Sequence, residues 1–386
     1  MEICKSAKCT GCGVCVDACP KNCIALRHDE NGFYRSCVNE DDCIRCGRCR
    51  KVCPANHPNN TRRIRKAYKA RRTDKEAAAL STSGGIAAVL SEYVIRCGGT
   101  VAGCGYDGAM LLRHSLASAP EELEAFKGSK YLQSYTVGIY RLVREQLKTG
   151  KPVLFVGTPC QVAALQNYVG KEQDNLYTVD FVCHGVSSQS VFDKFLASVH
   201  PTERPVSIRF RNKTQGYRSK RACFELQVEY ADQTVRSGLD EGVYCWFASA
   251  LTARESCYAC PFVSVDRASD LTLADYIGKD LDDEDNEIGV STVFVNSDKG
   301  AALLGAVQDE TSLTERDPTE TVLRYDRMLM SAPKPACRKR FFADLPNRDY
   351  AELARTYTAA AIAPGKMRGR YYAMKRRFCR LRMRGR

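Results

Sequence analysis

Eight of the 21 cysteines in this chain form two matching runs near the start of the sequence. Each run has the spacing C-x2-C-x2-C-x3-C-P, and together they comprise Cys9, Cys12, Cys15, Cys19, Cys43, Cys46, Cys49 and Cys53. Thiolates at this spacing bind [4Fe–4S] clusters, because three cysteines close over one cube while the fourth reaches a second cube. The pattern predicts chemistry by transfer of single electrons.

The repeat predicts a small two-cluster ferredoxin domain over residues 1–60. Because the fourth cysteine of each run crosses over, we expect one cluster on Cys9, Cys12, Cys15 and Cys53, and the other on Cys43, Cys46, Cys49 and Cys19. A zinc ribbon needs only two C-x2-C pairs per site, so it does not explain the third cysteine, the three-residue gap or the proline after each run. Secreted disulfides are disfavoured because no apolar signal segment precedes the first run.

Four later cysteines predict a third [4Fe–4S] cluster. Cys160 lies in the first turn of a predicted helix with Thr158 as its N-cap, and Cys183 ends the next predicted strand. Both positions fall at the carboxyl edge of a parallel sheet, where open α/β folds bind ligands. Cys257 and Cys260 would complete a four-thiolate site. Two alternatives remain open, namely that Cys160 and Cys183 are buried structural cysteines, or that Cys160 is a redox-active thiol.

The other cysteines lack partner spacing, and we expect them to be small core residues. They are Cys4, Cys23, Cys37, Cys97, Cys104, Cys223, Cys245, Cys337 and Cys379.

Composition limits the classes of protein that fit the chain. It has 386 residues, enough for two or three domains. No apolar run approaches the roughly 18 residues of a spanning helix, so we expect a cytoplasmic protein. The net charge is +13, but the stretch 366–386 has ten Lys and Arg and no acid, so the basic character belongs mostly to a tail.

The order of predicted elements indicates an α/β domain behind the ferredoxin domain, an α+β arrangement overall. Helices are predicted over 86–97, 139–148, 159–169 and 300–307, and strands over 100–106, 152–156, 176–182 and 290–295. Strand, helix and strand in succession form a right-handed parallel unit. Antiparallel strands are predicted over 207–210, 222–230 and 233–236, and 280–287 reads as an acidic mobile loop.

The domain boundaries follow from these elements. A basic stretch over 61–80 is predicted to be a linker, or the first strand of the next unit, and is a candidate for docking an acidic partner. The α/β domain spans 81–350, with sub-parts at about 81–150 and 151–350. A basic tail covers 351–386. Two interpretations of 366–386 stay open, a basic amphipathic helix on anionic lipid at the inner face of a membrane and a solvated helix, whereas nucleic-acid binding is disfavoured because no nucleic-acid module accompanies it.

A phosphate site is predicted at the start of the first long helix. Ser83, Gly84 and Gly85 precede that helix, whose first N–H groups and positive dipole end attract phosphate. Lys130 adds positive charge. A Rossmann dinucleotide site is not supported, because the chain has no G-x-G-x-x-G.

From Ser81 to about Leu304 the chain resembles the coenzyme F420 hydrogenase/dehydrogenase beta-subunit family. The motifs that carry the resemblance are Ser83-Gly84-Gly85, residues 127–134, 156–165, 183–186, 210–213, 257–262, 267–270 and 289–291. The resemblance implies an FAD-containing iron–sulfur oxidoreductase, and all four later cysteines lie in its motifs. It implies a flavin-binding α/β domain, in which Lys130, Thr158 and Arg211 are candidate polar contacts.

One departure from the family pattern concerns the substrate pocket. Where the family has a Gly-Asp-aromatic-Trp-Gly element, this chain has Ala274-Asp275-Tyr276-Ile277-Gly278. The missing tryptophan puts coenzyme F420 itself in doubt as the substrate, since family members also reduce other conjugated molecules. The catalytic residues stay unassigned, because Asp275, His184 and Tyr258 each have a ready structural explanation.

The resulting expectation is an oxidoreductase that passes electrons between [4Fe–4S] clusters and, through FAD, a hydride-accepting small molecule. The alternative is an electron-transfer subunit without a substrate site of its own, serving a partner enzyme in a membrane-associated polysaccharide pathway. Both interpretations require a redox partner protein.

Overall fold

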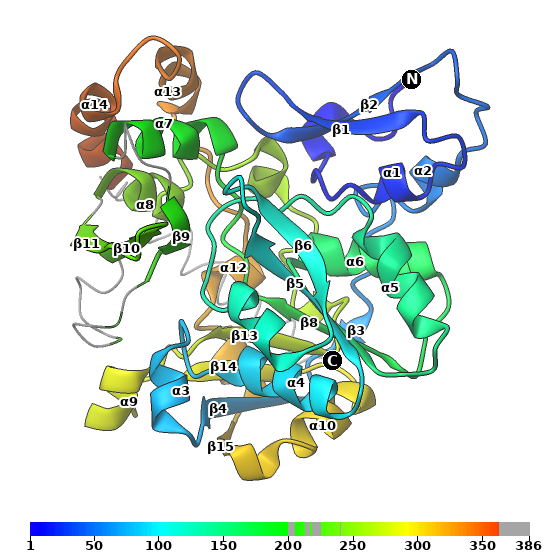
Figure 1. The fold of residues 1–386 in the computed structure, drawn as a ribbon, viewed down its shortest axis with the longest axis vertical. Helices are drawn as coiled ribbons and strands as arrows, with labels where there is room; N and C mark the ends of the chain where they lie inside the picture. The colour runs from blue at the N-terminus through cyan, green and yellow to red at the C-terminus, as the bar shows by residue number, and fades with distance from the viewer. Residues whose placement is uncertain (200–204, 212, 214–216, 218–224, 240, 363–386) are drawn as a thin grey trace.

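The structure is a computed structural model that describes residues 1–199, 205–211, 213, 217, 225–239 and 241–362 (Figure 1). A ferredoxin-like domain, a large mixed sheet with helices on both faces, and a smaller antiparallel sheet make up the molecule. The predicted tail helix over 366–386 lies outside the described residues.

The ferredoxin-like domain repeats one short unit. Helix α1 (Val14–Asp17) and helix α2 (Arg48–Lys51) each begin after a glycine in the left-handed region, Gly13 with φ 71° and Gly47 with φ 74°. Strands β1 (Ile24–His28) and β2 (Tyr34–Val38) pair antiparallel. Each short helix carries the third cysteine of its run, so the backbone repeat follows the cysteine repeat.

The large sheet has eight strands in the order β15-β4-β14-β13-β8-β7-β5-β6. They are β4 (Lys66–Arg72), β5 (Thr100–Tyr106), β6 (Leu112–Ala117), β7 (Val153–Val156), β8 (Leu176–Phe181), β13 (Leu271–Asp275), β14 (Ser291–Val295) and β15 (Thr311–Arg316). Strands β5, β7, β8 and β13 are parallel neighbours, while β6 and β14 flank them antiparallel. The predicted parallel unit, β7–α6–β8, is confirmed.

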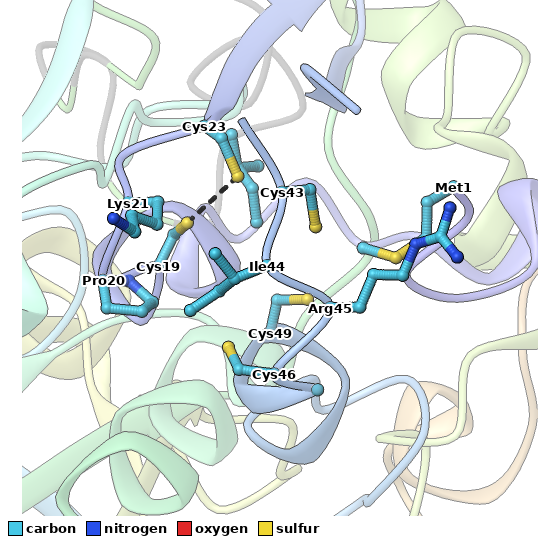
Figure 2. A pocket seen from close by; sticks show the side chains of 12 residues that line it. Met1, Cys19, Pro20, Lys21, Cys23, Cys43, Ile44, Arg45, Cys46 and Cys49 are labelled. Carbon is cyan, nitrogen blue, oxygen red and sulfur yellow. Dashed lines mark hydrogen bonds between the residues drawn. The ribbon is translucent and has the colours of Figure 1, made fainter. Parts of the chain in front are cut away.

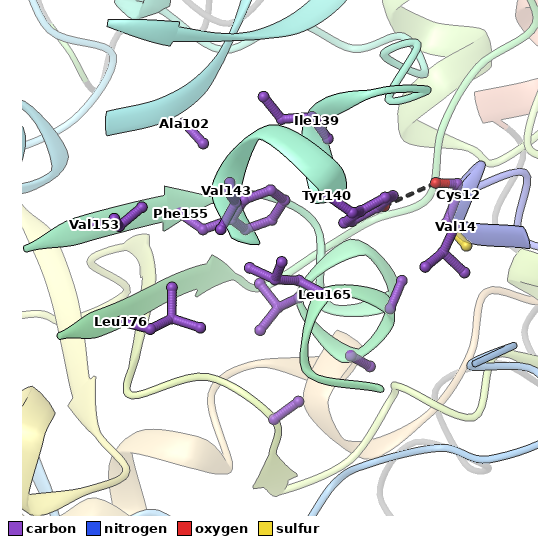
Figure 3. Close-up of a cluster of buried hydrophobic side chains, with 14 of the residues drawn as sticks. Cys12, Val14, Ala102, Ile139, Tyr140, Val143, Val153, Phe155, Leu165 and Leu176 are labelled. Atoms are coloured by element: carbon purple, nitrogen blue, oxygen red, sulfur yellow. Dashed lines mark hydrogen bonds between the residues drawn. The ribbon is translucent and has the colours of Figure 1, made fainter. Parts of the chain in front are cut away.

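Helices cover both faces of this sheet, as the alternation of side chains along a strand requires. Val153 and Phe155 of β7 pack with helices α5 (Ile139–Leu147) and α6 (Pro159–Val169), as Figure 3 shows. Leu154, between them, packs with α4 (Ile86–Arg96) and α10 (Asp298–Gly305) on the other face. The result is a three-layer α/β/α domain that holds the carboxyl ends of β7 and β8 in fixed positions.

Two segments differ from the simplest sequence interpretation. Part of the 61–80 stretch is strand β4, which lies between β15 and β14. Of the two predictions for this stretch, the first strand of the next unit is therefore correct there, and the linker is not. The expected acidic loop over 280–287 is wrong, because α9 (Asp283–Ile288) forms there. Asp282 caps α9 by accepting from the Asp285 N–H, and Lys69 and Arg71 of β4 pair with its acids. Partners on a distant strand, invisible in the local sequence, stabilise this helix.

The smaller sheet has the order β11-β10-β9 and is antiparallel, as predicted. Its strands are β9 (Pro205–Arg209), β10 (Glu225–Tyr230) and β11 (Val235–Leu239); residues 222–224 of the predicted strand lie outside the described part of the chain. Helices α7 (Gln189–Val199), α8 (Glu241–Ala248), α13 (Arg338–Asp344) and α14 (Tyr350–Ile362) gather beside it (Figure 1). The buried Trp246 packs against Phe341 and Tyr350 at their centre.

The remaining elements are short. They are β3 (Arg62–Arg63), β12 (Asp266–Arg267), α3 (Lys75–Ala79), α11 (Pro318–Val322), α12 (Asp326–Leu329), and the 3-10 helices η1 (Ser6–Lys8), η2 (Pro120–Phe126), η3 (Glu255–Ala259) and η4 (Gln308–Glu310). Strand β15 follows the strand that the sequence analysis took as the last one. No helix in the described part of the chain is both long and apolar enough to cross a membrane.

Candidate iron–sulfur centres and the adjoining cofactor site

Four cysteines of the ferredoxin-like domain surround one cavity, and we call them the outer set. Cys43, Cys46 and Cys49 line it from the second run, and Cys19 lines it from the first (Figure 2). This is the crossed arrangement that the spacing predicts. A fifth thiol joins them, because the Cys23 and Cys19 sulfurs lie 3.4 Å apart.

The inner cysteine set, Cys9, Cys12, Cys15 and Cys53, lies closer to the α/β domain. Burial, together with the neighbouring Cys9 and Cys53 thiols, raises the pKa of the Cys15 thiol to about 12. Cys12, which contacts the α/β domain, is also buried. A fifth thiol is close here too, because Cys4 is the main influence that lowers the pKa of Cys9 to about 5.

Of the cysteines predicted to be core residues, Cys37 and Cys97 are exposed, whereas Cys4 and Cys23 are not. They do lie in a buried cluster, but against the predicted cluster ligands. The signal available in the sequence was their closeness to the two runs, five residues before Cys9 and four after Cys19. Spacing alone does not show which way a side chain points.

The four later cysteines also come together. Burial raises the pKa of the Cys183 thiol, and Cys257, Cys160 and Cys260 raise it further as near neighbours. The pKa of Cys160 is raised to about 11 by burial, although a 3.1 Å contact with the Thr158 hydroxyl lowers it in part. Helix α6, the end of β8 and η3 deliver these thiols, so the predicted sheet edge does assemble the set.

The donor chemistry of all three sets suits iron–sulfur clusters. Cysteine thiolates are the ligands that [4Fe–4S] clusters use. Within the described residues, no three His, Cys, Asp or Glu side chains stand close enough to hold one metal ion. A [4Fe–4S] cube does not need that closeness, because each thiolate binds a different iron.

Hydrogen bonds attach the inner loop of the ferredoxin-like domain to the α/β domain. The Cys12 carbonyl accepts from the Thr136 hydroxyl at 2.6 Å and from the Tyr140 hydroxyl at 2.8 Å, the latter drawn in Figure 3. The Gln133 amide donates to the carbonyls of Thr10 and Gly11 at 2.8 and 2.9 Å. The inner set is therefore held against the domain that carries the later cysteines.

Cys12 and Cys160 lie at the contact between the two sets. Burial raises the pKa of Cys12, and Cys160 is among the thiols that raise it further. The inner and later sets are thus electrostatic neighbours across the domain contact.

A buried arginine occupies the same contact. Arg254 is 1% exposed and donates to the Cys9 carbonyl and the Gln133 amide oxygen, each at 2.8 Å, and to the Tyr34 carbonyl. Burial lowers its pKa, while Cys9 and Cys257 oppose this effect. No carboxylate of the described residues forms an ion pair with it, so its charge faces the thiols. No motif or spacing around this arginine indicates such a role.

The predicted flavin contacts are brought together only in part. Ser83 hydrogen-bonds to the Val290 carbonyl at 2.7 Å and lies 3.4 Å from the Tyr217 hydroxyl. The Arg211 guanidinium lies over the ring of that tyrosine, 5.3 Å from its centroid. Gly85, with φ 79°, caps helix α4 beside them. This region combines cations, an aromatic ring and a helix N-terminus.

Lys213 is a further cation in this region that the sequence analysis quoted only within a motif. Its ammonium donates to the carbonyls of Ser83 and Ala78 at 2.8 and 3.0 Å, and to that of Ile288. Burial lowers its pKa to about 7. A lysine whose pKa is strongly perturbed by burial and by a neighbouring cation marks a candidate functional site.

Three predicted contacts have other uses here. Lys130 donates to the carbonyls at the end of η2, and burial lowers its pKa to about 8. Thr158 lies beside Cys160 rather than beside Ser83. A Cβ atom on Gly84 would meet the Ala70 carbonyl at 2.5 Å, so close packing against β4 explains that glycine.

Other residues of the family motifs have structural roles. Arg267 pairs with Asp180 at 2.8 Å, and both are buried. The Asp270 carboxylate accepts from the Thr178 N–H and hydroxyl at 2.8 and 2.7 Å. These contacts fix the junction of β8 and β13.

Comparison with known proteins follows the same division of the chain. Residues 150–321 match the family described as the C terminus of the coenzyme F420 hydrogenase/dehydrogenase beta subunit. This part of the α/β domain is similar to that family. Residues 8–57 match the 4Fe–4S dicluster domain, so the beta-subunit domain follows an iron–sulfur domain on one chain, as the resemblance implied.

Two individual proteins are also similar. An uncharacterized ferredoxin of Methanocaldococcus jannaschii is 43% identical over 49 residues, which is 13% of this chain and 62% of the relative. A chain in the F420-reducing [NiFe] hydrogenase complex from Methanosarcina barkeri is 18% identical with a TM-score of 0.44, over 66% of this chain and 83% of that one.

Proposed function

We propose that this protein is an iron–sulfur oxidoreductase that passes electrons between its ferredoxin domain and a hydride-exchanging site in the beta-subunit domain. The observation that carries the proposal is that four cysteines converge beside Cys12, namely Cys160, Cys183, Cys257 and Cys260. The loop that contains Cys12 is itself hydrogen-bonded to the α/β domain. A ferredoxin domain that served only as a detachable carrier would not need its inner loop bound by buried side chains of the neighbouring domain.

The proposed route runs through three [4Fe–4S] clusters in a fixed order. The outer set is at the surface, because Cys46 is exposed. The inner set follows, since Cys15 is an electrostatic neighbour of Cys49. The later set comes last, because its Cys160 is an electrostatic neighbour of Cys12 in the inner set. Electrons would pass in either direction along this order.

FAD is the cofactor that we propose beyond the third cluster. When bound, a flavin exchanges single electrons with clusters and a hydride with a substrate. Ser83 and the N-terminus of α4 would position its phosphates, and Arg211 and Lys213 would neutralise their charge. The substrate would be coenzyme F420 or another conjugated small molecule.

One observation favours the alternative of an electron-transfer subunit without its own substrate site. Arg211 already pairs with Asp275 at 2.6 Å, and Ile277, in the place of the family tryptophan, is 48% exposed. A substrate ring would have to compete for Arg211 and would lack the tryptophan surface. The partner enzyme would then hold the substrate site.

Cofactor content tests the proposal. We would purify the protein anaerobically and measure iron, acid-labile sulfide and extracted flavin per chain. Three clusters predict about twelve irons, with one FAD. The double variant Cys257→Ser/Cys260→Ser should retain about eight, while the exposed Cys97→Ser should retain all.

The outcomes separate the two functions. About eight irons in the unaltered protein would refute the third cluster. Three clusters without flavin would instead favour the electron-transfer subunit.

A further inference from the structure

Exposed cations gather on the surface over the outer cysteine set, beside the exposed acids Asp41 and Asp42. Lys21, Arg45, Arg48 and Lys51 are exposed there, and Arg144 joins them from helix α5 of the neighbouring domain. We call these residues the basic outer face. Within the described part of the chain, none of them forms an ion pair with an acid, so their charge faces solvent.

A groove runs from this face to a predicted cluster ligand. Its volume is about 430 Å³, and its lining includes Cys19, Arg48, Lys51, Arg141 and Arg144. The groove beside Cys19 of the outer set is therefore lined by cations.

The acidic residue in the lining of this groove, Asp17, is occupied by hydrogen bonds to the backbone. The Asp17 carboxylate accepts from the N–H groups of Gly138, Tyr140 and Arg141 at 2.7, 3.1 and 3.3 Å, at the start of α5. It is 5% exposed. The groove therefore presents positive charge to any molecule that approaches.

The loop of the second run adds an apolar contact point. Ile44 is 58% exposed between Cys43 and Cys46, and Figure 2 shows it among the cysteines of the outer set. A large exposed apolar side chain among unpaired cations resembles the centre and rim of a transient protein interface. A small anion would gain nothing from contact with an apolar side chain.

We propose that the basic outer face docks an acidic one-electron carrier protein. This inference rests on the proposed function, because it requires an outer cluster that exchanges electrons. Complementary charge would steer the carrier to the face and raise the association rate. Ile44 would contact the carrier directly and exclude water near the cluster.

The electron count of the docking reaction is simple when flavodoxin is the probe. Flavodoxin hydroquinone gives up one electron and becomes the semiquinone. One [4Fe–4S] cluster of charge 2+ takes up that electron and becomes 1+. No proton or bond changes partner, so the semiquinone absorbance reports the transfer.

Stopped-flow mixing of the purified holoprotein with flavodoxin hydroquinone tests the proposal. The variant Arg48→Glu/Lys51→Glu/Arg144→Glu should slow the second-order rate at low salt by about tenfold or more. The matched control Lys151→Glu/Lys279→Glu/Lys339→Glu reverses as many exposed charges elsewhere and should stay within about twofold. In the unaltered protein, the rate should fall as salt increases.

A small reductant separates this proposal from the proposed function. Methyl viologen radical needs no docking face and should reduce all three proteins to the same extent. Failure to reduce the unaltered protein would count against the proposed function. Reduction by viologen but not by flavodoxin, equal slowing in both charge variants, or a rate that ignores salt would overturn the docking proposal. So would loss of DNA-oligonucleotide binding in the variant with unchanged electron transfer.

Discussion

Replacing Arg254 with methionine should lower the reduction potential of the inner cluster. The guanidinium is buried between the inner and later cysteine sets, and no carboxylate of the described residues offsets its charge. A positive charge stabilises the reduced cluster, which carries one more electron. Methionine has a similar length but no charge, so it removes the electrostatic effect while filling most of the space.

The magnitude follows from the contact with Cys9. The Arg254 Nε atom lies 2.8 Å from the Cys9 carbonyl oxygen, and the Cys9 sulfur is four bonds from that oxygen. The charge therefore stands roughly 7 Å from the sulfur, which at an effective dielectric constant of about 20 corresponds to about 2 kcal/mol. For one electron this is on the order of 80 mV. The lost hydrogen bonds should also cost about 3 kcal/mol of folding free energy.

An EPR-monitored redox titration measures the effect. Arg254→Met should shift one cluster by about 80 mV to more negative potential, while the outer cluster keeps its potential. Arg254→Lys keeps the charge and should shift the potential by much less, although it also loses hydrogen bonds. Equal shifts in both variants, or an unchanged potential in a methionine variant that retains its iron, would refute the electrostatic reasoning.

Three further predictions concern single residues. Cys19→Ser should keep its outer cluster better than Cys46→Ser, because the Cys23 sulfur lies 3.4 Å from Cys19 and can replace it; equal iron loss would contradict this. Burial holds the pKa of His114 at about 4, below its ordinary 6.5, so folding stability is lost as pH falls below 6.5. From pH 7.5 to 5.5 this group should contribute a loss of about 1.4 kcal/mol in urea unfolding, and His114→Phe should remove that contribution while His28 and His184 keep theirs; an unchanged pH slope in the variant would exclude this group. Arg267→Met should cost about 3–5 kcal/mol, because it leaves a buried carboxylate unpaired; a thermal shift of only a degree or two would show that the carboxylate is protonated or solvated.

The cysteine runs and the parallel unit could be predicted because their information is local. The spacing of Cys9 to Cys19 fixes which thiols share a loop, and the apolar run of β7 followed by the capped start of α6 fixes a strand and a helix. The crossed placement of Cys19 followed from the same spacing.

The remaining features depend on contacts between distant parts of the chain. Helix α9 forms because β4 supplies cations to its acids. Cys4 is an electrostatic neighbour of Cys53, which is far from it in the sequence. Nothing in the local sequence distinguishes Arg254 from other arginines, because its partners Tyr34, Cys9 and Gln133 are distant in the chain. Spacing and periodicity carry no information on such long-range pairs.

The hydrogen bonds that clasp the inner loop have a kinetic consequence. The contacts of Thr136, Tyr140 and Gln133 with that loop are buried and neutral, so dissolved ions screen them little. Under the proposed route, transfer between the domains would run at one rate whatever the salt or protein concentration. Entry through the basic outer face would depend on both. Raising the salt would therefore move control of turnover from the interior of the molecule to its encounter with the carrier.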